Sequence, residues 1–178
     1  RLRIAIVGRL VPVKGHIFLL EALARLKERV AGLECLVIGD GPDRLTLETD
    51  VRRLGLDTVV QFLGYRNDVH TLVSDVDVLC MPSLTEGLPY AALEAAMLDV
   101  PIVASAVGGL AEEFIHGETA RLVAAGDVGA LADELAWCAA HPREAQLLAA
   151  RAGRMVRERF SVAQMIERTA MVYAAAAT

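Results

Sequence analysis

Two glutamates eight residues apart frame a segment that could bind a phosphorylated ligand. Glu86 stands directly before Gly87, Leu88 and Pro89, and Glu94 follows in an alanine-rich apolar segment. Glycine allows close backbone approach to a ligand, and proline suits the first turn of a helix. With Pro89 as the first helical residue, Glu94 would lie roughly 7 to 8 Å further along the axis, at about 1.5 Å per residue.

The predicted helix start is a candidate phosphate site. Its first N–H groups have no partner within the helix, and the helix dipole is positive at that end. Glu94 could then accept hydrogen bonds from ribose hydroxyls, and Glu86 could bind hydroxyls beyond the phosphate. The spacing favours a nucleotide diphospho-sugar, although a helix cap and a solvated carboxylate would give the same pattern.

A second candidate segment, Gly8 to Gly15, follows the first apolar run and carries two cations in an otherwise acidic chain. Arg9 could hold phosphate oxygens through two hydrogen bonds, and Lys14 could act as a point charge. The alternative is that both are solvated loop residues. Neither G-x-G-x-x-G nor G-x-x-x-x-G-K-[ST] occurs here, so phosphates would be held by side-chain cations and a helix terminus.

Two further turns contain glycine. In Gly39-Asp40-Gly41-Pro42 we favour a turn or capping role for Asp40 over a ribose contact. Gly64 and Tyr65 follow the third apolar run, where main-chain groups could contact a nucleotide base. An ordinary turn explains this second segment equally well.

Apolar runs of strand length alternate with longer amphipathic segments. Continuous apolar runs are typical of strands covered on both faces, and the alternation predicts a parallel sheet with right-handed crossovers. We therefore predict an α/β fold, a Rossmann-like doubly wound parallel sheet with helices on both faces and ligand loops at the carboxyl ends of the strands. The predicted strands are 3–7, 34–38, 59–63, 78–81, 102–104 and 120–123. The predicted helices are 16–30, 43–55, 67–74, one from Pro89, one after a turn at 107–113, 128–140, 142–159 and one capped by Ser161.

Composition narrows the function. The 178 residues suit one domain, and 54% hydrophobic residues predict a large core. A net charge of −5 and 4% aromatic residues argue against a nucleic-acid surface. Three widely spaced cysteines and four scattered histidines indicate neither a disulfide framework nor a metal site, and we expect a reducing cytoplasm. No apolar run is long enough for a transmembrane helix.

Taken in order, these motifs resemble the C-terminal half of a GT-B fold, retaining glycosyltransferase of the family 4 (group 1) type. The matching segments are Gly8-Arg9-Leu10 with Lys14-Gly15, Gly39-Asp40-Gly41-Pro42, Phe62-Leu63-Gly64, Pro82-Ser83, Glu86-Gly87-Leu88-Pro89 through Leu93-Glu94-Ala95, Pro101-Ile102-Val103-Ala104-Ser105, Gly108-Gly109 with Glu112, and Phe160-Ser161. Asp99-Val100 departs from the family, which usually has glycine before this proline.

The resemblance implies a hexosyltransferase-type enzyme that transfers a sugar from a UDP-, GDP- or ADP-sugar with retention, without a cofactor or a divalent metal at the diphosphate. Glu86 and Glu94 correspond to the family's E-x7-E motif, so Glu94 would hold the ribose and Glu86 the donor sugar. Arg9 and Lys14 would neutralise the diphosphate and act, with Glu86, in catalysis. The remaining donor-binding residues would be Gly8, Gly64, Tyr65, Gly87, Leu88 and Pro89. A covalent-nucleophile role for Glu86 is the minority alternative.

Residues 1–178 would form one donor-binding domain. The helices from about residue 141 would pack on a missing N-terminal domain, which would bind the acceptor and carry any peripheral membrane association. We expect the isolated chain to bind a nucleotide or nucleotide sugar without transferring it. The sugar, base and acceptor stay open.

Two other function classes compete. A sugar-nucleotide epimerase half-domain would need an acid/base residue, for which the chain offers Glu86, Asp40 or His116. A non-catalytic nucleotide-binding or receiver-like regulatory domain would need a cluster of aspartates at the strand ends.

Overall fold

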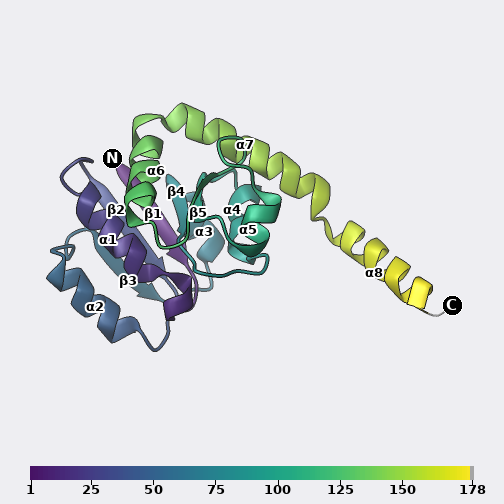
Figure 1. The fold of residues 1–178 in the computed structure, drawn as a ribbon, viewed down its shortest axis with the longest axis horizontal. Helices are drawn as coiled ribbons and strands as arrows, with labels where there is room; N and C mark the ends of the chain where they lie inside the picture. Colours follow the sequence, from purple (N-terminus) through teal and green to yellow (C-terminus); the bar gives the residue numbers. More distant parts are fainter. Residues whose placement is uncertain (177–178) are drawn as a thin grey trace.

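A six-stranded parallel sheet forms the centre of the molecule (Figure 1). The computed structural model describes residues 1–176. The strand order is β3-β2-β1-β4-β5-β6, and every pairing is parallel. The strands are β1 (Leu2–Val7), β2 (Leu33–Ile38), β3 (Val60–Gly64), β4 (Val78–Met81), β5 (Ile102–Ser105) and β6 (Arg121–Val123). The predicted fold class is confirmed, and the predicted strands are nearly those observed.

Helices cover both faces of the sheet, which is why the strands are continuous apolar runs. One core cluster joins the sheet to α1 (His16–Leu26), α2 (Arg44–Arg53) and α6 (Val128–Ala140). The opposite cluster joins it to four more helices, α3 (Val69–Ser74), α4 (Tyr90–Met97), α5 (Gly108–Glu113) and α7 (Pro142–Arg159). All four residues of β4 and of β5 are buried between these layers.

The two halves of the sheet meet at β1 and β4. These strands are neighbours, but the chain leaves β1 toward α1 on one face and leaves β4 toward α4 on the other. Such a point, where the strand order reverses, leaves a crevice at the carboxyl ends of the strands. A short 3-10 helix, η1 (Pro12–Lys14), lies in the loop after β1.

Three predicted helices are shorter in the structure, since 16–30, 43–55 and 67–74 are observed as α1, α2 and α3. The first helix ends at Leu26 rather than residue 30, and the Arg29 amide closes a tighter turn on the Leu26 carbonyl at 2.8 Å. Gly32, with a φ of 67°, then turns the chain into β2.

The segment predicted as a turn at 107–113 is instead mostly helix α5, and the helix predicted after it does not form. Val107 is the extended N-cap of α5. After α5 the chain makes an isolated bridge between His116 and Ala120 and enters β6.

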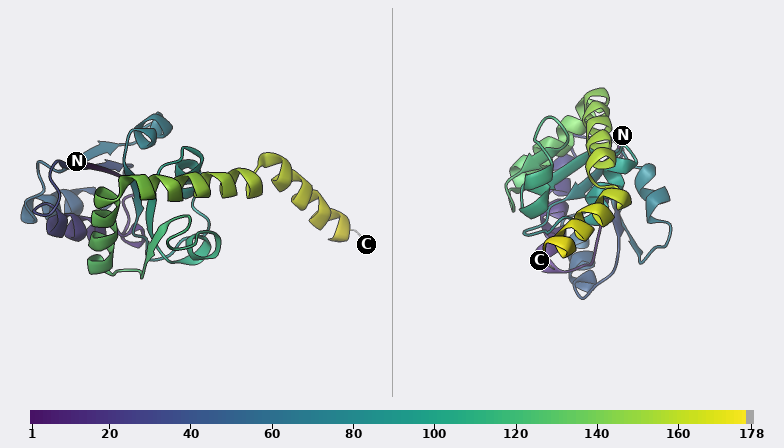
Figure 2. Two further views of the ribbon diagram at one scale, coloured as in Figure 1. Left: turned by 90° about the horizontal axis from the view of Figure 1, so that it is seen from above. Right: turned by 90° about the vertical axis from the view of Figure 1, so that its right-hand side faces the viewer.

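The last helix, α8 (Val162–Ala176), extends away from the body of the domain (Figures 1 and 2). Ser161 Oγ accepts a hydrogen bond from the Gln164 amide at 3.2 Å, which confirms the predicted N-cap. The exposed large apolar side chains of α8 are Val162, Met165, Ile166, Met171, Val172 and Tyr173. By contrast, α7 packs on α4 within this domain. The sequence predicted that the helices from about residue 141 would pack on another domain, and this stays a prediction for α8.

Two arginines of α7 have partners elsewhere in the domain. Arg157 donates to the Met97 carbonyl and pairs with Asp99, and Arg159 pairs with Glu113 at 2.8 Å. No helix within residues 1–176 has the length and apolarity needed to cross a membrane.

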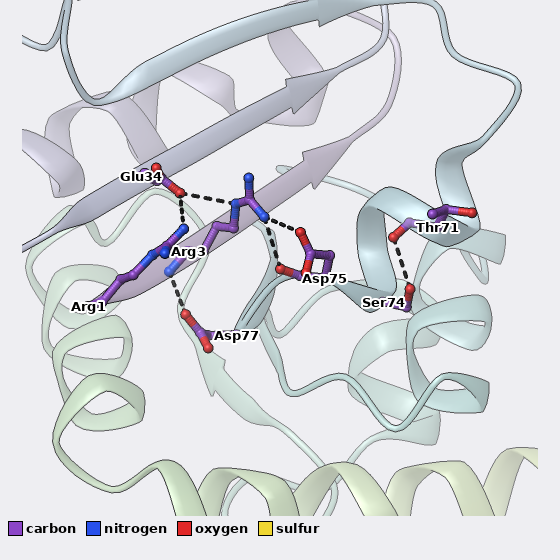
Figure 3. Close-up of polar contacts among 7 residues, drawn as sticks. All are labelled: Arg1, Arg3, Glu34, Thr71, Ser74, Asp75 and Asp77. Atoms are coloured by element: carbon purple, nitrogen blue, oxygen red, sulfur yellow. Dashed lines mark hydrogen bonds and ion pairs between the residues drawn. The ribbon is translucent and has the colours of Figure 1, made fainter.

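A polar network ties together the amino ends of β1, β2 and β4 (Figure 3). The Arg3 guanidinium pairs with Glu34 at 3.1 Å and with Asp75, while the Arg3 amide donates to Asp77 Oδ2 at 2.7 Å. Arg1 also pairs with Glu34. These aspartates therefore lie at the edge of the sheet opposite the carboxyl ends and already have cationic or amide partners.

Candidate functional site

A cleft of about 400 Å³ opens at the carboxyl ends of β1, β2 and β3. Its lining includes Gly8, Arg9, Asp40, Tyr65 and Arg66. Three strand-end loops thus contribute to one recess, as the predicted fold requires. Tyr65 is 82% exposed, so its ring is free to contact a ligand.

Arg9 is the cation of this cleft whose charge is not already compensated. Its side chain is exposed and has no hydrogen bond or ion pair with any residue of the described part of the chain. Arg66, in contrast, makes a two-bond contact with Asp68 at 2.7 and 2.6 Å, and that guanidinium lowers the pKa of Asp68. An anion entering the cleft would therefore be attracted mainly to Arg9.

The backbone around the cleft is closely packed. A Cβ added to Gly39 would lie 1.9 Å from the Gly8 carbonyl oxygen, and the Gly39 amide donates to the Gly64 carbonyl at 2.8 Å. Gly64 itself has a φ of 67°, a conformation that favours glycine. Asp40 accepts from the Gly41 amide at 2.8 Å, which confirms the turn role predicted for it.

Lys14 and Glu86 form a direct ion pair between the loop after β1 and the loop after β4. Lys14 Nζ lies 2.6 Å from Glu86 Oε1, and the same oxygen accepts a hydrogen bond from Ser83 Oγ at 2.7 Å. The carbon chain of Lys14 runs past Gly8, within 4 Å of where a Cβ would stand. The sequence predicted separate phosphate and sugar roles for Lys14 and Glu86, but it did not predict that they would bind each other.

Helix α4 begins one residue later than predicted. Pro89 has an extended conformation, with φ −74° and ψ 126°, and is the N-cap rather than the first helical residue. The first backbone bond of the helix runs from the Ala92 amide to the Pro89 carbonyl at 3.1 Å. The amides of Leu88, Tyr90 and Ala91 have no backbone acceptor within residues 1–176, so they can donate to an anion.

The glycines at the start of α5 hold the loop before α4. A Cβ on Gly108 would lie 1.8 Å from the Glu86 carbonyl oxygen, and the Gly109 amide donates to the Gly87 carbonyl at 2.8 Å. Both glycines therefore pack against the backbone of the loop that carries Glu86.

Glu94 lies on α4, outside the lining of the cleft. It lines a small crevice with Val7 and Val69, two residues that also line the cleft. Its side chain is 42% exposed, and His70 Nε2 lies 3.6 Å from its Oε1. His70 was missed by the sequence reasoning because a lone histidine on a short helix carries no recognisable pattern.

The site has few groups that could transfer protons. His16, beside Lys14, is buried, and burial together with the Lys14 charge lowers its pKa to about 4, so it is neutral near pH 7. The thiols of Cys35, Cys80 and Cys138 are buried, which raises their pKa. Within residues 1–176, no three His, Cys, Asp or Glu side chains are arranged to hold a metal ion.

Comparison with known proteins gives a consistent family. The sequence model described as "Glycosyl transferases group 1" matches residues 1–155. The MMP alpha-(1->4)-mannosyltransferase of Mycolicibacterium hassiacum is 37% identical over 174 residues, covering 96% of this chain and 42% of that protein. The 2-deoxystreptamine glucosyltransferase of Streptomyces kanamyceticus is 34% identical over 131 residues, covering 72% of this chain and 34% of that protein.

Solved structures agree. HepE from Anabaena in complex with UDP-glucose has a TM-score of 0.92 at 26% identity, with 98% of this chain and 49% of that chain covered. The C-terminal domain of a group 1 glycosyl transferase (LpcC) from Francisella tularensis has the same fold, with a TM-score of 0.83 at 24% identity over 90% of this chain and 87% of that chain. The chain therefore spans half or less of the length of the curated relatives named here and of HepE, and the predicted GT-B half-fold is confirmed.

Proposed function

Since the chain belongs to the group 1 glycosyl transferases, we propose that it binds the nucleotide diphospho-sugar donor of a hexosyltransferase. The observation that carries this proposal is the contact between two loops at the carboxyl ends of the strands. Lys14, from the loop after β1 that also carries Arg9, pairs with Glu86 from the loop after β4, and the unpaired amides at the start of α4 follow Glu86. Together they offer positive charge and N–H donors to one diphosphate.

The carboxylates flank that diphosphate position. Glu94, in the small crevice that shares Val7 with the cleft, would accept hydrogen bonds from the ribose hydroxyls. Glu86, held at the loop before α4, would accept hydrogen bonds from the donor sugar. Tyr65 lines the cleft, and it would contact the base together with the backbone of the preceding residue, Gly64. UDP-glucose in the HepE structure supports a uridine donor.

The chemical step needs stabilisation of the leaving nucleoside diphosphate. In our proposal Arg9, Lys14 and the N-terminal amides of α4 supply this charge stabilisation without a divalent metal, because preorganised donors aimed at developing negative charge lower the barrier. Glu86 orients the sugar. In this proposal transfer retains the configuration at the anomeric carbon, which the E-x7-E motif formed by Glu86 and Glu94 supports.

A second half of the protein would bind the acceptor. The chain covers less than half of the mannosyltransferase relative, which supports this division. The isolated chain would then bind donor without transferring sugar to an acceptor. A cytoplasmic location, and any membrane association through the other half, belong to the same proposal.

Neither competing function gains support from the site. His116, which an epimerase would need near the sugar, accepts the Leu122 amide at 3.0 Å through Nδ1, next to β6. The aspartates Asp75 and Asp77 are engaged by Arg3 at the opposite edge of the sheet, which argues against a receiver-like acidic pocket.

Calorimetric titration of this chain with UDP, GDP, ADP and their hexose conjugates tests the proposal. Arg9→Ala and Lys14→Ala should each weaken binding about 10- to 150-fold, the effect of losing a hydrogen bond to a charged group. Glu94→Ala should weaken binding of every nucleotide tested.

Arg154→Ala is the matched control. Arg154 is an exposed arginine on α7 whose side chain has no ion pair within the described residues, so its loss changes net charge but not the site. Equal affinity of the wild-type chain and all three site variants, or no nucleotide binding at all, would contradict the proposal.

A further inference from the structure

Ser83 is one of very few buried polar side chains in the domain, at 2% exposure. It follows Pro82 at the carboxyl end of β4, three residues before Glu86. Its hydroxyl donates to Glu86 Oε1 at 2.7 Å. Because a buried hydroxyl without a partner is costly, this bond constrains both side chains.

Both contacts of the Glu86 carboxylate fall on one oxygen. Lys14 Nζ and Ser83 Oγ each bond to Oε1, and Oε2 has no hydrogen-bond partner within residues 1–176. Oε2 is also accessible to solvent. A carboxylate oxygen can accept two hydrogen bonds, so Oε2 is the oxygen with capacity for a ligand hydroxyl.

The backbone on either side of Ser83 is fixed to the loop that carries Lys14. A Cβ on Gly15 would lie 2.0 Å from the Pro82 carbonyl oxygen, and the Leu84 amide donates to the Val13 carbonyl at 2.8 Å. Ser83 is therefore a rigidly placed donor, whereas the ammonium of Lys14 ends a flexible chain and can reorient.

We propose that Ser83 is a positioning residue for recognition of the donor sugar. It holds Oε1 of Glu86 so that Oε2 faces the sugar hydroxyls, and it keeps the carboxylate in place when Lys14 turns toward the diphosphate. Without Ser83, a diphosphate that attracts Lys14 would weaken the remaining side-chain contact that orients Glu86. This inference rests on the proposed donor-binding function and adds a residue that acts through Glu86.

The experiment compares two affinities of the full 178-residue chain, for a nucleoside diphosphate and for the corresponding nucleotide hexose, using the nucleotide that the wild type binds most tightly. Ser83→Ala should weaken nucleotide-hexose binding about 5- to 30-fold and leave the nucleoside diphosphate unchanged, because only the sugar contact depends on Glu86 orientation. Ser83→Cys, which keeps a weak donor of similar size, should recover part of the lost affinity.

Ser105→Ala is the matched control. Ser105 is 1% exposed at the carboxyl end of the neighbouring strand β5, but its hydroxyl has no hydrogen-bond partner in the described part of the chain. It should leave the ratio of the two affinities unchanged, and thermal unfolding should verify that all variants fold.

The outcomes separate the two ideas. If the wild-type chain binds no nucleotide, the proposed function fails. If the wild type binds nucleotides but Ser83→Ala keeps the wild-type ratio of the two affinities, or weakens both equally, the positioning role is overturned while donor binding stands.

Discussion

The Lys14–Glu86 ion pair predicts an unusual effect of removing a carboxylate from the site. In the ligand-free protein, Glu86 pairs with Lys14, the cation that a diphosphate would bind. Glu86→Gln keeps the shape of the side chain but removes its charge. We therefore expect this variant to bind a nucleoside diphosphate more tightly than the wild type does.

The structure gives the expected size. The pair is 2.6 Å long, and the exposed fractions are 7% for the Glu86 side chain and 29% for Lys14, so solvent screens it only partly. A hydrogen bond between charged groups contributes about 1.5 to 3 kcal/mol. The three donors of an ammonium allow Lys14 to keep part of its contact with Glu86 while it binds phosphate. A net gain of about 1 to 2 kcal/mol remains, which is a 5- to 30-fold lower dissociation constant.

Titration calorimetry with the nucleoside diphosphate and the nucleotide hexose measures this effect. For the hexose conjugate, the lost bond from Glu86 to the sugar should offset the gain, so the preference for the hexose should fall. In a Lys14→Ala background the Glu86→Gln substitution should no longer tighten binding, because the cation it releases is absent. Glu28→Gln, at an exposed acid just after α1 with no ion pair among residues 1–176, is the charge-matched control.

The reasoning would be refuted if Glu86→Gln bound the nucleoside diphosphate no more tightly than the wild type. Equal tightening in the Lys14→Ala background would also refute it. The gain would then come from general loss of negative charge rather than from release of Lys14.

Three further predictions follow from the fold. Unfolded His16 gains a proton near pH 6.5, whereas folded His16 gains one only near pH 4. The free energy of unfolding should therefore fall as the pH drops across that interval, by up to about 3 kcal/mol at 1.36 kcal/mol per pKa unit. Denaturant titrations of a His16→Gln variant should show a weaker fall with pH, and a fall identical to that of the wild type would refute this prediction. Gly108→Ala should weaken nucleotide binding and lower the melting temperature more than Gly117→Ala does. Both glycines have a positive φ, but only Gly108 lies against the Glu86 carbonyl. Equal losses of affinity and melting temperature in the two variants would contradict a clash between the added Cβ and that carbonyl. The three buried cysteines should react with a thiol reagent at pH 8 only after unfolding, because burial raises their pKa, to about 12 for Cys35 and Cys138. Bound nucleotide should slow this reaction. Fast labelling of the native chain would argue against the packed core.

Much of the fold followed from the sequence because the strands are continuous apolar runs of unambiguous length. Val78–Met81 was predicted exactly as it occurs, and Ser161 was predicted as a cap from its position before an amphipathic segment. The first helix ended early, because local turns after Leu26 overrode a periodicity that continued beyond it. Periodicity reports which face is apolar but not where the chain must turn toward the next strand.

The candidate site was predicted as a set of residues, but not as an arrangement. Arg9 lines the cleft and Glu94 lines a separate small crevice, and the two share Val7 and Val69 in their linings. The contact between Lys14 and Glu86 joins residues 72 positions apart, and it depends on the neighbouring positions of β1 and β4. No local pattern contains that information. For the same reason Ser83 and His70 carried no signal, since each matters only through a carboxylate on another segment.

The opposite exits of the chain from β1 and β4 also bear on how relatives can diverge. The recess results from the winding of the backbone, so it persists whatever side chains border it. Tyr65 and Arg66 line the recess and are exposed, outside both core clusters. Substitutions there can change which base or sugar is accepted at little cost to folding, so selection can alter donor preference while the scaffold stays constant.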